Sequence, residues 1–176
     1  MRIKSKLFVS LAVSLWITSP PAFAQELERG RGGTLACGGT HGFQLGGNEI
    51  TFTNYNFRNF NESTTITIDS ITIYDADGMV LRNMPAADPF PPGFNNILRP
   101  HQTSTLGTID VFGNAPATAP STTPFQTIVQ WSASARGLGL FAHMARQDLG
   151  RDSVTGNLQE QRARSLFRCV TIGSVR

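Results

Sequence analysis

Short runs in which apolar and polar residues alternate constrain the fold of this chain more than any other feature. In residues 63–75, isoleucine alternates with threonine, slips by one position at Asp69-Ser70 and then resumes. β-Branched residues at period two are typical of strands, and a one-residue slip is what a β-bulge produces. Further runs of this kind lie at residues 48–57, 103–112, 124–134, 137–146 and 162–172.

Turn residues separate these runs, and helix signals are scarce. Five prolines lie in residues 84–100 and three in residues 113–124. Because proline has no N–H, neither stretch can pair inside a sheet, and both are expected to be connections. The pattern predicts an all-β fold, an antiparallel β-sandwich, immunoglobulin-like or related, with seven or eight strands and little helix.

The last run indicates which residues of the final strand face the core. Three arginines in residues 162–172 share one parity, whereas Phe167 and Cys169 share the other. Because a strand presents alternate residues to opposite faces, we expect the arginines to face water and Phe167 and Cys169 to face the core. Residues 157–164 also contain good helix formers, so a short helix there is an alternative.

The first 24 residues have the features of a secretory signal peptide. Three basic residues precede an apolar run at residues 7–17, and Ala22 and Ala24 suit a signal peptidase. We expect cleavage after Ala24 and export from a bacterial cytoplasm, to the periplasm or the outside. The run is shorter than the roughly 20 residues of a membrane-spanning helix, so we expect no transmembrane segment in the mature chain.

Glycine is frequent in the next segment, residues 25–48. These glycines do not open a helix after a strand, which argues against a phosphate-binding loop. We expect a flexible lead-in at residues 25–48, followed by a single domain at residues 49–176.

Charge argues against a nucleic-acid partner. Without the three bases of the signal peptide, 15 − 3 = 12 basic residues face 12 acidic ones, whereas nucleic-acid binding needs a basic patch. Residues 25–135 have five Arg and nine acids (5 − 9 = −4), and residues 136–176 have seven Arg and three acids (7 − 3 = +4). The simplest explanation of this opposite charge is that the two regions lie side by side in one fold. An anionic partner and a homo-oligomer with matched charges are the alternatives.

Cys37 and Cys169 are the only cysteines. In an oxidising compartment one disulfide between them is the simplest expectation, worth about 5 kcal/mol in the chain-entropy model. Two buried thiols are the alternative. No Cys-x-x-Cys or Cys-x-x-His pair is present, so we expect no metal site and no cofactor.

Asp75 and Asp77 begin a D-x-D-G sequence, as in some calcium loops. An EF-hand loop needs a glutamate at its twelfth position, where this chain has Ala86. Asp77-Gly78 between two apolar runs is instead a strong hairpin signal, because glycine accepts a positive φ. The sequence therefore predicts a turn.

No catalytic motif is visible. There is no G-x-S-x-G elbow and no H-E-x-x-H, and His41, His101 and His143 are far apart in the sequence. Paired carboxylates of the kind that hydrolyse sugars leave no sequence signal, so a hydrolase with an unrecognised site is an alternative function.

Aromatic residues in the proline-rich connection are the best indication of a binding site. Phe90 and Phe94 flank a Pro-Pro-Gly turn, and such a rigid aromatic platform suits a ligand or a protein partner. The alternative is that both rings pack under the loop. Together with His143 and Arg146, they are the candidate ligand-binding residues.

Two stretches carry a resemblance to known families. ITIDSITIYDADGMVLRN (residues 66–83), followed by ILRPHQTSTL, resembles the middle of small, uncharacterised bacterial secreted domains. FQTIVQWSASARGLGLFAHMARQD (residues 125–148) is similar to the β-sandwich of sensory rhodopsin transducer proteins, in which an apolar strand, a tight turn and a strand ending in His and Arg follow one another. The resemblance covers roughly residues 50–150. It implies a sandwich, oligomerisation and a binding role, and it assigns no functional residue.

These features predict an exported, non-catalytic module that binds a small ligand or an envelope protein. A structural, self-assembling envelope protein is the first alternative. A hydrolase is the second.

Overall fold

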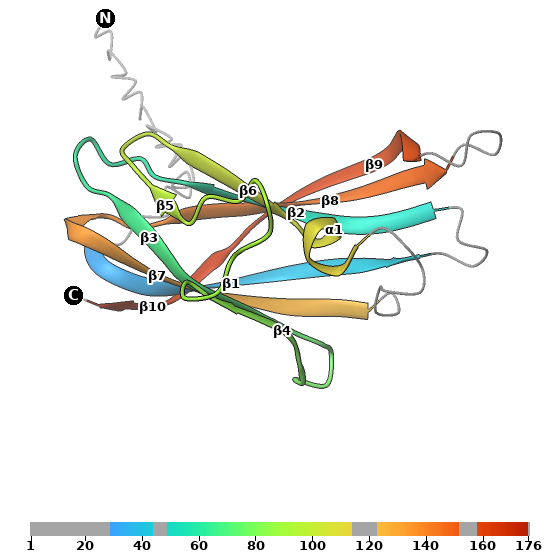
Figure 1. Cartoon of the computed structure of the whole chain (residues 1–176), viewed down its shortest axis with the longest axis horizontal. Coiled ribbons are helices and arrows are strands. Elements are labelled where there is room, and N and C mark those ends of the chain that lie inside the picture. The colour runs from blue at the N-terminus through green and yellow to red at the C-terminus, as the bar shows by residue number, and fades with distance from the viewer. Residues whose placement is uncertain (1–28, 44–48, 114–122, 152–157, 176) are drawn as a thin grey trace, which may run out of the picture.

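The computed structural model describes residues 29–43, 49–113, 123–151 and 158–175 (Figure 1). These residues form ten strands, all paired antiparallel, and one short helix. The elements are β1 (Arg29–Phe43), β2 (Glu49–Arg58), β3 (Ile66–Tyr74), β4 (Val80–Pro85), β5 (Ile97–Leu98), β6 (Thr103–Gly107), α1 (Thr108–Phe112), β7 (Thr123–Leu138), β8 (Phe141–Arg151), β9 (Leu158–Arg168) and β10 (Val170–Val175). The all-β antiparallel fold is confirmed, with ten strands instead of seven or eight. The immunoglobulin-like sandwich stays a prediction.

Strand β1 joins two groups of strands. The β7 group contains β4, β3, β7 and β10, with β5 beside β3, and the β8 group contains β6, β2, β8 and β9. One edge of β1 pairs with β7 along most of its length. Its other edge pairs with β10 at residues 32–36 and with β2 at residues 42–43, so β1 passes from one group to the other.

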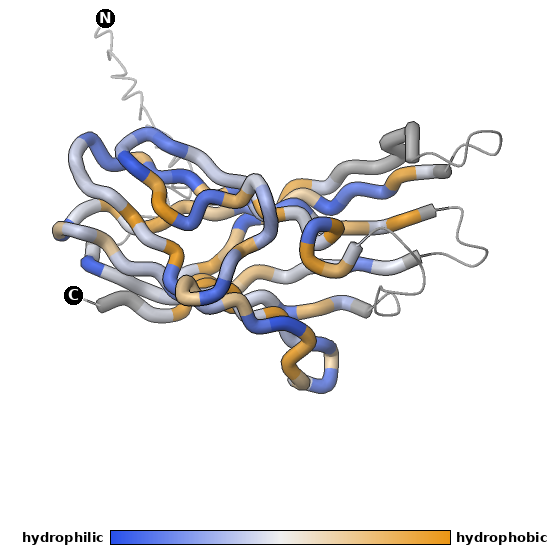
Figure 2. The backbone as a smooth tube through the Cα atoms, viewed as in Figure 1, coloured by the Kyte–Doolittle hydropathy of each residue, from blue (hydrophilic) through white to orange (hydrophobic). Residues whose placement is uncertain are grey.

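The hydrophobic core collects side chains from both groups. Apolar and polar colours alternate along the tube in Figure 2, as expected for strands with one buried face. The buried core residues are Leu35, Cys37, Tyr55, Phe57, Ile66, Ile68, Ile71, Ile73, Met84, Leu98, Leu106, Phe125, Val129, Trp131, Leu140, Ala142 and Cys169. The alternation of β3 is interrupted by an irregular register between Ile68 and Ser70, in agreement with the predicted bulge.

The glycine-rich segment was expected to be a lead-in, and this was wrong for residues 29–43, which form β1. Glycine suits this strand because neighbouring atoms approach its backbone closely. A Cβ on Gly33 would lie 2.7 Å from the carbonyl oxygen of Gly173 in β10, and one on Gly39 would collide with the Tyr55 hydroxyl. The domain therefore begins before residue 49.

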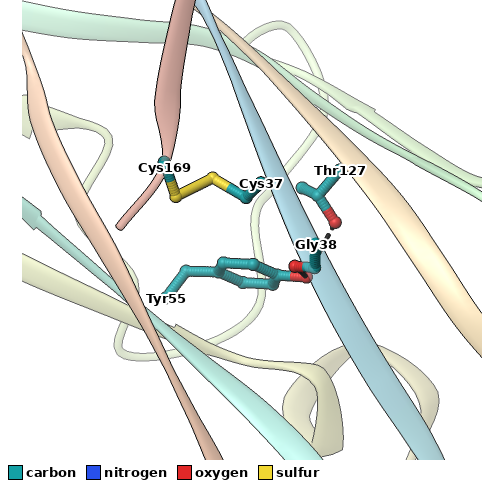
Figure 3. The surroundings of a disulfide bond; sticks show 5 residues. All are labelled: Cys37, Gly38, Tyr55, Thr127 and Cys169. Atoms are coloured by element: carbon teal, nitrogen blue, oxygen red, sulfur yellow. Dashed lines mark hydrogen bonds between the residues drawn. A yellow bond between two sulfur atoms is a disulfide. The ribbon is translucent and has the colours of Figure 1, made fainter. Parts of the chain in front are cut away.

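Side chains of β2 bond to residues of β1 that lie between its pairing with β10 and its pairing with β2. The Tyr55 hydroxyl donates to the Gly38 carbonyl over 3.0 Å and lies 2.7 Å from the Thr127 hydroxyl of β7 (Figure 3). The Thr53 hydroxyl accepts from the Thr40 N–H and donates to the Thr40 carbonyl. These side chains replace the missing strand partner, so the backbone of β1 stays hydrogen-bonded where it changes group.

The predicted disulfide between Cys37 and Cys169 is present (Figure 3). Cys169 is the single residue between β9 of the β8 group and β10 of the β7 group. Its N–H donates to the Ala142 carbonyl of β8. The disulfide therefore links the two places where the chain passes between the groups.

The final strands differ in one respect from the expectation. Cys169 is buried as predicted, but Phe167 is 51% exposed, so placing it in the core was wrong. Alternation along one strand did not predict both residues because Cys169 lies beyond the end of β9, at the crossover to β10. Phe167 is still in β9, opposite Met144. Residues 158–164 are strand, and the helical alternative is not observed there.

Two turns complete the fold. The Asp75 carboxylate accepts hydrogen bonds from the N–H groups of Asp77 and Met79, and Gly78 has φ = 81°, which confirms the hairpin turn between β3 and β4. Residues 108–112 were expected to continue a strand, but they form α1. The Asp110 carboxylate accepts from the Gly107 N–H and so favours a helical turn.

Candidate functional site

A groove lies where β1 separates from β10 and approaches β2. Its volume is about 340 Å³, which is at the lower end of the range for small-molecule sites. The residues that line it are Gly39, Thr40, Thr53, Pro124, Met144, Arg146 and Phe167. They come from β1, β2, β7, β8 and β9, so the groove depends on the meeting of the two strand groups.

The apolar lining consists of Pro124, Met144 and Phe167. Met144 is half-buried and packs against the core on one side, while Phe167 lies opposite it in the register of β8 and β9. An exposed phenyl ring beside a half-buried thioether is an uncovered apolar surface. Burial of such surface contributes roughly 25 cal/mol per Å².

The polar lining offers few groups for a ligand. The Thr53 hydroxyl is already used, because it accepts from the Thr40 N–H and donates to the Thr40 carbonyl. The Thr53 N–H in turn donates to the Thr108 hydroxyl. These groups hold β1, β2 and α1 together and are already hydrogen-bonded.

Arg146 is the charged residue among those that line the groove. Its Nε donates to the Asp148 carboxylate over 3.3 Å, and the same carboxylate oxygen accepts from the Thr51 hydroxyl over 2.6 Å. The Arg146 side chain is 51% exposed, whereas that of Asp148 is 19% exposed. Asp148 is thus fixed by β2 and orients the guanidinium through one of its three nitrogens.

The sequence-predicted site residues do not come together. Arg146 lines the groove, but His143 lies on the opposite face of β8 from Met144, beside Phe141 at 6.1 Å between ring centroids. Phe90 and Phe94 pack under their loop. Their ring centroids are 5.0 Å apart, and Phe94 contacts Phe57 of the core at 5.8 Å.

His41 is a buried core histidine near α1. Its Nδ1 lies 3.0 Å from the Thr108 hydroxyl, and its ring centroid is 5.4 Å from that of Phe112. Burial lowers the pKa of His41 below its ordinary value, and a hydrogen bond with the backbone of Gly113 opposes this effect. Among the residues that the structure describes, no three His, Cys, Asp or Glu side chains are grouped to hold a metal ion.

A second, more open cavity of about 620 Å³ lies at the other end of β8. Phe60, Asn61, Glu62, Arg136, Gly137 and Leu138 line it. The Asn61 amide is fully used, since its Nδ2 donates to the Leu138 carbonyl and to Asn59 Oδ1, and its Oδ1 accepts from the Leu138 N–H. This amide has a structural task, so the groove is the better candidate site.

Sequence reasoning missed the apolar part of the groove. Parity placed Phe167 in the core, and Met144 had no sequence signal that separates a core methionine from a groove methionine. Their placement opposite each other depends on the register of β8 and β9, which shifts at two irregular positions.

The sequence matches no protein-family model and no curated protein sequence. Among solved structures, a crystal structure of Thermotoga maritima 1070 aligns with a TM-score of 0.41 and 12% identity. The alignment covers 82% of this chain and 94% of that chain. Over the described part of this chain, there is no helix of the length and apolarity needed to cross a membrane.

Proposed function

We propose that the protein is an exported, non-catalytic module that binds a small ligand in the groove between β1 and β8. The observation that carries this proposal is the uncovered apolar pair Met144 and Phe167 beside an oriented cation, Arg146. Sites for small molecules are concave and mostly apolar, with a few placed polar groups. The signal-peptide features and the disulfide support export, because disulfides persist in oxidising compartments.

Thermal unfolding with a panel of small molecules tests this proposal. The protein is purified with its disulfide intact and mixed with simple sugars, glycans, divalent metals and anionic small molecules. A ligand at 100 times its dissociation constant stabilises the protein by about 2.7 kcal/mol. The stabilisation should disappear in Phe167→Ala and persist in Leu166→Ala, a matched control on the neighbouring, opposite-facing residue of β9. Equal shifts in both variants would place the ligand elsewhere.

A self-associating structural protein is the second candidate. Leu166, Val170 and Ile172 of the last two strands are each more than half exposed. The opposite charges of residues 25–135 and 136–176 favour a second copy of this chain as the partner. Light scattering at low and high salt tests this role. A protein that is monomeric at high concentration and low salt does not have it.

A further inference from the structure

We infer that the ligand of the groove is a small amphiphile with an apolar chain or ring at one end and a carboxylate or similar anion at the other. This inference rests on the proposed function. It names the chemical class of ligand that the residues lining the groove favour.

The apolar end is indicated by Met144, Phe167 and Pro124, which present three kinds of apolar surface to the same space. A polar ligand such as a sugar needs several hydrogen-bonding groups in its site. The Thr53 hydroxyl and the Thr40 backbone are already bonded to each other, so the side chains of Thr40 and Arg146 would have to serve all the hydroxyls of a sugar, which are too few partners. The lining therefore favours a ligand that is apolar along most of its length.

The anionic end is indicated by Arg146. Asp148 contacts the guanidinium at Nε, and the two Nη groups provide a pair of parallel donors that match a carboxylate. The Thr51 hydroxyl of β2 donates to the same oxygen of Asp148 and holds this carboxylate in place. Arg146 is thereby held at the groove by the bond from Nε to Asp148, and its two Nη groups are the donors that an anion can use.

The size of the groove limits the ligand. A volume of about 340 Å³ is close to the minimum for sites of drug-sized molecules. Medium-chain carboxylates are therefore suitable probes. Octanoate, 1-octanol and octylamine have chains of equal length and differ in the charge of the head group.

Calorimetric titration of these three probes tests the inference. Octanoate should bind about tenfold more tightly than 1-octanol, the difference expected for one charge-assisted hydrogen-bonded pair. Arg146→Met should abolish this preference, because the variant has no guanidinium to pair with the carboxylate. Arg146→Lys should retain part of the preference, because lysine keeps the charge but lacks the fork. Arg82→Met on β4 removes the same charge from an exposed remote position and should change nothing.

The other outcomes separate the two proposals. If octanoate and 1-octanol bind equally, and both lose affinity in Phe167→Ala, the groove is a binding site but the anionic class is wrong. If octylamine binds most tightly, Asp148 and not Arg146 selects the head group, and the inference is overturned. If none of the three probes binds, both the inference and its apolar basis fall.

Discussion

The Tyr55 hydroxyl connects three strands: β2 of the β8 group, which carries it, the joining strand β1, and β7 of the β7 group. It contacts the Gly38 carbonyl of β1 and the fully buried Thr127 hydroxyl of β7. Burial raises the pKa of Tyr55 above its ordinary value, so it remains a neutral donor at all physiological pH values.

Removal of this hydroxyl should be costly. Tyr55→Phe leaves the buried Thr127 hydroxyl and the half-buried Gly38 carbonyl with one partner fewer each, so we expect a loss of about 2 kcal/mol in the free energy of unfolding, measured by urea denaturation. Tyr74→Phe, at the half-buried end of β3, is the matched control and should change stability by less than about 0.5 kcal/mol. Equal effects of the two substitutions would mean that the Tyr55 bonds do not stabilise the junction.

His41 should make stability dependent on pH. Its pKa in the folded protein is lower than the ordinary 6.5, so below about pH 6.5 the unfolded chain binds a proton more readily than the folded one. Stability from this group is therefore complete above pH 6.5 and falls as the pH decreases toward the lowered folded value.

Urea denaturation between pH 8 and pH 5.5 measures this dependence. His41→Gln should remove the slope below pH 6.5, whereas His101→Gln, on the exposed residue that pairs with Glu62, should keep it. A slope that is the same in wild type and His41→Gln would assign the dependence to another group.

At the scale of elements, the sequence predicts strands well wherever apolar residues alternate. β3 and β7 bury every second residue over much of their length, and the turn after β3 carries Asp and Gly as expected. β1 was missed because its glycines contribute no alternation, although they are what permits close packing against Tyr55 and β10. Its pairing with three other strands is a tertiary property that no local window contains.

The disulfide should stabilise the junction between elements. It closes a loop with a sequence separation of 132 residues, for which the chain-entropy model gives about 5 kcal/mol. We expect a reductant to lower the midpoint of urea unfolding strongly in the wild type. A Cys37→Ala, Cys169→Ala double variant should unfold at the lower midpoint with or without reductant. Equal midpoints for the oxidised and reduced wild type would contradict this account.

At the scale of the whole molecule, the candidate site exists because two groups of strands separate along β1. Arg146 was among the residues chosen from the sequence, but the other residues that line the groove come largely from four other strands, β1, β2, β7 and β9. The aromatic platform expected at Phe90 and Phe94 instead covers the core, since burial against Phe57 removes more apolar surface from water than exposure on a loop. Such long-range choices depend on packing and register, which local patterns do not specify.

The central claim is that the groove binds an amphiphile, and methyl NMR of the methionines tests it most directly. Met144 lines the groove, while Met79 in the exposed turn and the buried Met84 of β4 are remote references. On titration with octanoate, we expect a saturable shift of the Met144 methyl resonance and none at Met79 or Met84. An unmoved Met144 resonance, or equal movement of all three, would contradict the account.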